Sequence, residues 1–482
     1  MNLAIIQPVA DVRHAARAYR DEVALLAAVL GRAGHAVTLA VLAPDEAGDA
    51  ARALAEAQPD VILLYVEGLS ADAAAKAAGS AASAVGAPLV AFGPHARLCP
   101  DACLSLAGAE AVAVAPGPWV VPEYVEARGG RIDSLRTPGL WVKCETGVMR
   151  NAAPRPPASL GDEPLPNRGL YTSDQTLDAA GFAPITVARG GEGPSPTEPT
   201  GAPGAPGARG SASAPGKPPA PPLPGPAAAP APWPVLHRPV EAILEEMHEV
   251  AAEQLDLGGW SVGNARWTAD PAYLEAFAER YAREVGLPLR TVLHAADVTP
   301  ETAALLARAG CNEVTLPLGS ASNLIRTEVL GLDASAEAVA AAAAALRQAG
   351  IRTAVAVEIG APYETPVTID ETVELLRRLA PDRVAARLHW PEPGSASERI
   401  AREHEWLVPD PASAYLAGGP AVVPASLSAE ALIEAAELLP YRVLRPRVVP
   451  LLRLARRVRI PGKGTVYECL VKPFLVPPVR KA

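Results

Sequence analysis

Aromatic residues and cysteines are both scarce in this sequence of 482 residues. Aromatic residues make up 4% of it, with only four phenylalanines, and there are five cysteines. An odd number of cysteines, most of them far apart, is typical of a reducing compartment and argues against a fold built on disulfides. We therefore expect a cytoplasmic protein.

Long apolar segments are lacking as well. No run of about 18 apolar residues is free of both charge and proline, so no membrane-spanning helix is expected. The first seven residues lead directly into a strand pattern and lack the basic segment with which a signal peptide begins. We predict no membrane partner.

Positive charge is in deficit, with a formal net charge of −10. The basic stretch 442–459 holds seven arginines among Leu, Val and Pro, and we interpret it as the solvated face of a helix or strand. Such a charge balance argues against nucleic-acid binding. The glycine-rich nucleotide-binding motifs and the His-Glu-x-x-His zinc motif are also absent.

Proline and glycine, in contrast, are in excess, with 52 and 39 residues. They concentrate in one tract, residues 190–234, where 24 residues are Gly or Pro. A segment of this composition cannot bury a core, so we predict a disordered linker there. The tract divides the chain into two parts that each show regular patterns.

The first part, residues 1–135, alternates strand and helix patterns and predicts a doubly wound, Rossmann-like α/β domain. In such domains ligands bind at the carboxyl ends of the strands. A connector follows at 136–189, with a hairpin at 140–148. The expected strands are 3–6, 36–42, 61–66, 88–92 and 111–115, and the expected helices are 19–33, 46–57 and 71–85.

The second part, residues 235–400, repeats a β/α unit about five times and predicts a partial barrel. A C-terminal extension with a helix near 429–438 occupies 401–482. The expected strands are 257–262, 290–293, 313–318, 354–359 and 383–388, with helices at 239–255, 270–285, 300–309, 334–349 and 368–379.

Four short strings, in this order, resemble motifs of the radical S-adenosylmethionine proteins that carry an N-terminal cobalamin-binding domain. They are residues 90–96, with Gly93-Pro94-His95; 161–168, an acidic and proline-rich bridge; 309–314, a strand entry at Cys311; and 359–365, a Gly-x-Pro-x-Glu-Thr turn. The resemblance covers about residues 1–400. It implies a cobalamin-binding domain followed by a partial (β/α) barrel of the radical type.

The resemblance also implies where cobalamin would rest, namely on the loops after the strands of the first domain. Glycines there let the backbone approach a bulky ligand, and a hydroxyl such as that of Ser70 can hydrogen-bond it. The positions carried over are Gln7, Pro8, Glu67, Gly68, Leu69, Ser70, Gly93, Pro94, His95, Pro116 and Gly117.

The sequence departs from the family at the site of its radical chemistry. Where the family has three cysteines that hold a [4Fe–4S] cluster, this chain has Gly191, Ser195 and Glu198. Where the family has a glutamate that helps to hold S-adenosylmethionine, this chain has Gly319. We therefore expect no iron–sulfur cluster, and the same departures count against binding of S-adenosylmethionine.

Two functions remain open. The chain is either a cobalamin-binding accessory or partner subunit, for example of a cluster-bearing paralogue in a biosynthetic pathway, or a cluster-independent cobalamin-dependent enzyme. The second would carry out methyl transfer or related chemistry on a substrate held in the barrel.

Several other residues are candidates for a metal site or for the rim of a pocket. His95, Cys99 and Cys103 have the spacing of metal ligands on one helix face, but Pro100 should break that helix, so we interpret the cysteines as packing residues. His14 is interpreted as a surface helix residue. Near the ends of barrel strands stand six residues interpreted as a solvated or pocket rim: Trp260, Asn264, Arg266, Glu358, Glu364 and His389.

Overall fold

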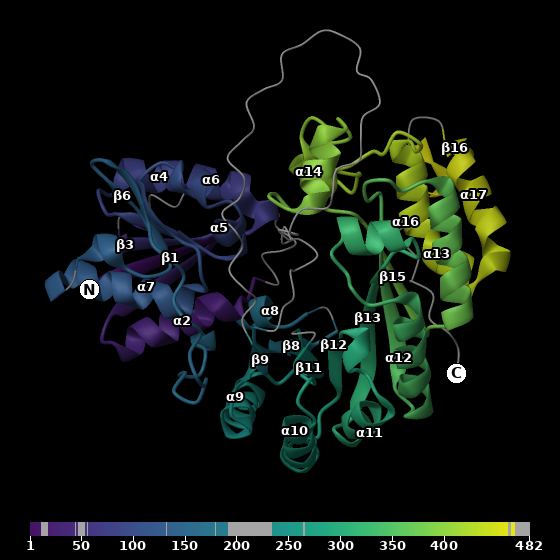
Figure 1. Cartoon of the computed structure of the whole chain (residues 1–482), viewed down its shortest axis with the longest axis horizontal. Helices are drawn as coiled ribbons and strands as arrows, with labels where there is room; N and C mark the ends of the chain where they lie inside the picture. The colour runs from purple at the N-terminus through teal and green to yellow at the C-terminus, as the bar shows by residue number, and fades with distance from the viewer. Residues whose placement is uncertain are drawn as a thin grey trace, which may run out of the picture.

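The fold consists of two sheets, each with its own helices, and the domains that they form lie side by side (Figure 1). The structure, a computed structural model, describes residues 1–10, 18–43, 45–46, 54, 56–131, 133–178, 180–190, 234–263, 266–460 and 464–467. The cluster positions 191, 195 and 198, the helix expected at 46–57 for the most part, and His14 lie outside the described residues.

The first sheet has seven strands in the order β2-β1-β3-β4-β5-β6-β7. Strands β1 to β5 are parallel, and β6 and β7 add an antiparallel hairpin where a hairpin was predicted. The order turns back between β1 and β3, which is the point where doubly wound folds bind ligands. The strands are β1 (Asn2–Pro8), β2 (Ala36–Leu42), β3 (Val61–Tyr65), β4 (Leu89–Phe92), β5 (Ala109–Ala113), β6 (Leu140–Cys144) and β7 (Gly147–Arg150).

Helices cover both faces of this sheet, as expected for strands that are apolar throughout. Residues of α2 and α7 pack with Leu3, Ile5 and Leu63 on one face, and residues of α4 and α6 pack with Ala4 and Ile62 on the other. The helices are α2 (Asp21–Arg32), α4 (Ala71–Ala84), α5 (Pro94–Leu98), α6 (Pro100–Leu104) and α7 (Gly117–Glu126).

The second sheet has six parallel strands in the order β15-β14-β13-β12-β11-β8. Within the described ranges its two edge strands, β8 and β15, do not pair, so the barrel is open, as the prediction of a partial barrel requires. The strands are β8 (Phe182–Ile185), β11 (Gly259–Val262), β12 (Leu289–Val292), β13 (Cys311–Gly319), β14 (Arg352–Ile359) and β15 (Arg383–Leu388).

The helices that follow these strands cover one face of the sheet (Figure 1). Along β13 and β14, buried residues such as Leu316 and Val357 alternate with partly exposed ones such as Thr315 and Glu358. Because alternate side chains of a strand point to opposite faces, Thr315 and Glu358 lie on the face that these helices do not cover. The helices are α9 (Val240–Glu253), α10 (Pro271–Glu284), α11 (Pro300–Arg308), α12 (Ala336–Gln348) and α13 (Pro366–Leu379).

Two regions were not foreseen in detail. The connector at 136–189 supplies α8 (Ser173–Thr176) and the edge strand β8. Strand β8 was not predicted because it contains Pro184, and proline is rare inside strands that are not at an edge. The C-terminal extension adds α14 (Ala396–Glu403), α15 (Pro411–Leu416), α16 (Ala429–Leu444) and α17 (Val449–Arg457). No helix among the described residues has both the length and the apolarity to cross a membrane.

Candidate functional site

The carboxyl edge of the first sheet holds most of the residues predicted to bind a cofactor. Gln7, at the end of β1, is buried, donates to the Ala18 carbonyl at 2.5 Å and accepts from the Tyr171 hydroxyl at 2.6 Å. Glu67, after β3, accepts from Arg20 Nε at 2.5 Å and from the Tyr65 hydroxyl at 3.3 Å. These two side chains are therefore engaged by the protein itself.

The loop after β4 places a histidine at the same edge. Gly93 has a φ of +107°, which disfavours any other residue, and a Cβ there would lie 2.8 Å from the Val66 carbonyl oxygen. His95 follows on α5 and is 6% exposed, and its Nδ1 has no hydrogen-bond partner among the residues that the structure describes. Burial lowers the pKa of His95, so the imidazole is held neutral.

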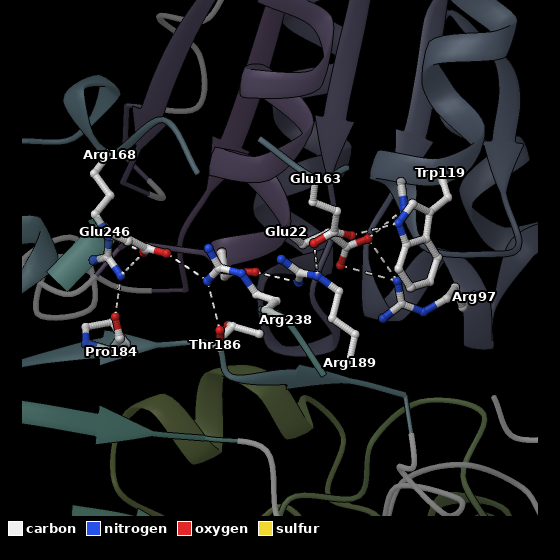
Figure 2. Close-up of polar contacts among 12 residues, drawn as sticks. Glu22, Arg97, Trp119, Glu163, Arg168, Pro184, Thr186, Arg189, Arg238 and Glu246 are labelled. Atoms are coloured by element: carbon white, nitrogen blue, oxygen red, sulfur yellow. Dashed lines mark hydrogen bonds and ion pairs between the residues drawn. The ribbon is translucent and has the colours of Figure 1, made fainter. Parts of the chain in front are cut away.

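The glycine at the start of α7 ties three helices together. The Gly117 N–H donates to Glu22 Oε1 at 2.9 Å, and Arg97 Nη1 donates to the same oxygen at 3.0 Å (Figure 2). A Cβ on Gly117 would lie 2.7 Å from the Phe92 ring. The neighbouring Pro116 is the N-cap residue of α7.

The second domain reaches this edge through the segment after β15. The Glu392 carboxylate accepts from the Gly68 N–H and, at 2.8 Å, from Trp390 Nε1. It fills the space that a side chain on Gly68 would need. Burial raises the pKa of Glu392, and the nearby Glu67 carboxylate raises it further. Gly68 is thus a point of close approach between the two domains.

A buried ionic network lies beside this edge (Figure 2). Glu246, on α9, accepts from Arg168 Nε at 2.8 Å and from Arg238 Nη1 at 2.7 Å. All three side chains are at most 7% exposed. The two arginines also donate to the carbonyl oxygens of Pro184 and Thr186, so they fix the chain where it leaves β8.

Arg189 extends the network to the first domain. It donates to Asp21 Oδ2 at 2.6 Å and to Glu163 Oε2 at 3.0 Å, and Trp119 Nε1 donates to Glu163 Oε1 at 3.1 Å (Figure 2). Burial opposes ionisation of Asp21, but Arg189 and Arg238 outweigh it and hold its pKa below the usual range. One strand of a small hairpin, β9 (Ala188–Arg189), carries Arg189; the other is β10 (Leu236–His237).

This network was not predicted from the sequence. Glu246 offered the clearest signal, because it shares the apolar stripe of its helix with Ile243, Met247 and Val250. A carboxylate on a buried stripe requires a buried cationic partner. Arg168 was noted only as part of the connector string.

The carboxyl edge of the second sheet carries a second polar group of residues. His389 Nδ1 lies 2.5 Å from Glu358 Oε2, and Arg387 Nη2 donates to Glu358 Oε1 at 2.5 Å. His389 is 4% exposed. Burial disfavours the charge on Glu358, yet the bonds from His389 and Arg387 prevail and lower its pKa to about 2.

Glu364 lies close to this pair and behaves in the opposite way. It is 1% exposed and accepts from the Gly360 N–H with Oε2, while Oε1 finds no partner within the described ranges. Burial raises its pKa to about 8, and the Glu358 charge adds to the shift. Interpreting Glu358, Glu364 and His389 as a solvated rim is therefore wrong, because later segments of the chain cover them.

The structure also shows the surroundings of the remaining residues that were considered as sites. Trp260 is not on a pocket rim, because it is fully buried in the core of the second domain. Arg266 pairs with Asp297 at 2.6 Å, and Asn264 falls in a gap of the description. The helix through Cys99 is broken at Pro100, as predicted, and burial raises the pKa of Cys103 to about 12.

The position of the missing family glutamate is tightly enclosed. Gly319 ends β13 with a φ of +67°, and a Cβ there would lie 2.6 Å from Leu330 Cδ1 and 2.8 Å from Leu332 Cδ1. A carboxylate side chain at this position would be strained by the backbone and by both leucines.

Comparison with known proteins gives matches in structure alone. No protein-family model and no curated protein matches the sequence. TsrM from Kitasatospora setae, a radical S-adenosylmethionine methyltransferase solved with cobalamin and a [4Fe–4S] cluster bound, matches with a TM-score of 0.62 and 17% identity over 90% of this chain and 84% of that one. The chain has the fold of such cobalamin-dependent radical enzymes.

A second match supports the same fold. OxsB, a cobalamin-dependent S-adenosylmethionine radical enzyme solved with aqua-cobalamin and S-adenosylmethionine bound, gives a TM-score of 0.61 and 11% identity, over 96% of this chain and 69% of that one. At these identities the likeness shows the architecture, a Rossmann-like domain followed by an open β/α barrel.

Proposed function

We propose that the chain binds cobalamin at the carboxyl edge of its first sheet and acts without a [4Fe–4S] cluster, as an accessory or partner subunit of a cluster-bearing paralogue in a biosynthetic pathway. The observation that carries the cofactor is the buried, neutral His95 at that edge, whose Nδ1 lacks a partner among the described residues. A buried polar atom of this kind is costly unless a ligand or water satisfies it.

The residues present fit a large ligand with many amide groups. His95 would hydrogen-bond it, and the backbone at Gly93 would lie against it, close to the turn-back of strand order between β1 and β3. Glu392 would have to release the Gly68 N–H for the ligand to reach that backbone. Cobalamin, when bound, supplies a cobalt centre that can accept and donate a methyl group.

The absence of a cluster is proposed on two grounds. The sequence has no cysteine at the three positions that correspond to the cluster ligands, which are Gly191, Ser195 and Glu198. Gly319 supplies no carboxylate to help hold S-adenosylmethionine, and its φ of +67° would strain any side chain placed there. The two features lie far apart in the sequence and both remove parts of the same chemistry.

A second candidate function is a cluster-independent, cobalamin-dependent methyl transfer enzyme. The Glu358–His389 pair favours it, because a buried, hydrogen-bonded pair at the carboxyl edge of a β/α sheet stands where such folds place their reactive residues. Turnover by the isolated chain would favour the enzyme, whereas activity seen only together with a cluster-bearing partner would favour the accessory role.

The cofactor is tested by purifying the full chain with hydroxocobalamin, removing the free compound and recording the visible spectrum. We expect bound cobalamin, with an affinity about tenfold weaker in His95→Ala, because one hydrogen bond to the ligand is lost. The matched control is His248→Ala, an exposed histidine whose ring contacts only the Glu284 carbonyl among the described residues. A colourless wild-type protein would refute the cofactor.

The cluster is tested separately by anaerobic reconstitution with iron and sulfide. We expect no stoichiometric iron after desalting. About four irons per chain, with the absorption of a [4Fe–4S] centre, would refute the cluster-free part of the proposal and leave the cobalamin part standing.

A further inference from the structure

Glu358 and His389 are brought together by the pairing of the last two strands of the second sheet. Glu358 on β14 lies opposite Arg387 on β15. The backbone N–H of His389 donates to the Ile359 carbonyl at 2.7 Å. Residues two apart on a strand share a face. Arg387 and His389 therefore flank Glu358 on the face of the sheet opposite helices α9 to α13, where later segments of the chain bury His389.

The carboxylate of Glu358 fixes the orientation of the imidazole. Its Oε2 lies 2.5 Å from His389 Nδ1, and its Oε1 is occupied by Arg387. An ionised carboxylate can only accept, so Nδ1 carries the hydrogen of this bond, and in the neutral form of the ring Nε2 then holds a free lone pair. Nε2 is buried, and no group in the described part of the chain is hydrogen-bonded to it.

The surrounding charges support this arrangement. Arg387 is 70% exposed and neutralises Glu358 from the solvent side. Glu364, from the turn after β14, is held protonated by burial, and Tyr415, on α15, interacts with both Arg387 and Glu358. The Trp390 and Tyr415 rings lie 5.4 Å apart beside the pair, which adds an aromatic wall.

We propose that Glu358 and His389 form a proton-accepting pair for a small substrate that carries a weakly acidic O–H or N–H group next to an aromatic ring. The bond from hydrogen to the substrate heteroatom breaks, its electron pair stays on the heteroatom, and the proton is bound by Nε2. Glu358 then stabilises the imidazolium across the Nδ1 bond. His389 is the catalytic residue and Glu358 the positioning residue. The inference does not depend on the binding of cobalamin.

The experiment uses the full chain without cobalamin, labelled with ¹⁵N-histidine, and long-range ¹H–¹⁵N NMR of the rings. The proposal requires a hydrogen on Nδ1 of His389 and none on Nε2. Titration with phenol should shift the Nε2 resonance, whereas anisole, which lacks the acidic hydrogen, should leave it unchanged. A hydrogen on Nε2 in the free protein, or equal shifts with both compounds, would overturn the proposal.

Two variants separate positioning from a structural role. Glu358→Gln should release the fixed tautomer and weaken the phenol response by about tenfold, because the imidazolium loses its charged partner. Glu371→Gln, an exposed glutamate on α13, is the matched control and should respond like the wild type. If Glu358→Gln is folded and keeps both the tautomer and the phenol affinity, the carboxylate does not position the ring and the proposal fails.

Discussion

The carboxyl edges of the two sheets differ in what they offer a ligand. At the first edge Gly68 and Gly93 let the backbone pack closely against its neighbours, and side chains such as Gln7 and Glu67 are hydrogen-bonded within the protein. At the second edge two carboxyl groups have shifted pKa values, lowered at Glu358 and raised at Glu364. The first edge is suited to binding and the second to proton transfer.

This contrast follows from how each sheet is covered. The first sheet is packed by helices on both faces, so a ligand can approach only at the strand ends. The second sheet has helices α9 to α13 on one face, and its other face carries ionisable side chains such as Glu358. Under the two proposals, one chain would bind the cofactor at the first edge and accept a proton at the second, and Glu392 contacts Gly68 at the first edge.

The largest expected effect comes from breaking the network beside both edges. Glu246→Ala leaves Arg168 and Arg238 buried without their carboxylate, and we expect a loss of about 3–5 kcal/mol in the free energy of unfolding. Urea unfolding of the full chain measures it.

Its control is Glu241→Ala on the same helix. The Glu241 side chain is 74% exposed and pairs with Arg280 at the surface, so the loss should stay below about 1 kcal/mol. If the two variants lose equal stability, the buried network does not hold this region together.

The second edge is tested by pH. The folded pKa of Glu364 is raised to about 8, so its stabilising, neutral form is fully present below its unfolded pKa and is lost as the pH rises toward 8. The wild type should lose up to about 1.4 kcal/mol per pH unit within that window relative to Glu364→Gln, which stays neutral. Parallel stability curves for the two proteins between pH 5 and pH 8, measured by urea unfolding, would contradict the raised pKa.

The first edge is tested by adding one methyl group to the backbone, in the variant Gly93→Ala. Gly93→Ala combines an unfavourable φ with a Cβ 2.8 Å from the Val66 oxygen, so we expect a loss of about 1–3 kcal/mol in stability and weaker cobalamin binding. Gly79→Ala, in the interior of α4 with open space around it, should instead gain up to about 1 kcal/mol. Thermal unfolding and cobalamin titration of both variants measure these effects. Equal stability and equal cobalamin affinity in the two variants would contradict the expectation.

Much of the architecture could be predicted because the strands and helices have strong local patterns. Strand β3 is apolar over its whole length, and α13 begins at a Thr-Pro pair, so both were expected close to where they lie. Strand β8 was missed because its identity depends on pairing with β11, which follows it by more than 70 residues. A proline-rich tetrapeptide gives no local signal of that partner.

For the candidate site residues, the sequence predicted where they lie along the strands but not whether they are buried. His95 was identified at a strand end through the family resemblance, and Glu358 from its place near the end of a predicted strand. Whether they are solvated or buried depends on residues far away in the chain, such as Glu392 against Gly68 and the segment after β15. Burial, and with it the pKa values, is a tertiary property that the local sequence does not contain.

The small hairpin of β9 and β10 has a consequence for how the chain tolerates change. It holds Arg189 opposite Leu236, so the two ends of the segment between them lie close together. If that segment behaves as its composition predicts, doubling its length would cost only about 0.6 kcal/mol in closure entropy. The two sheets should therefore accept a whole inserted protein module here, such as a fluorescent reporter, and this point would also suit a fusion to a candidate partner.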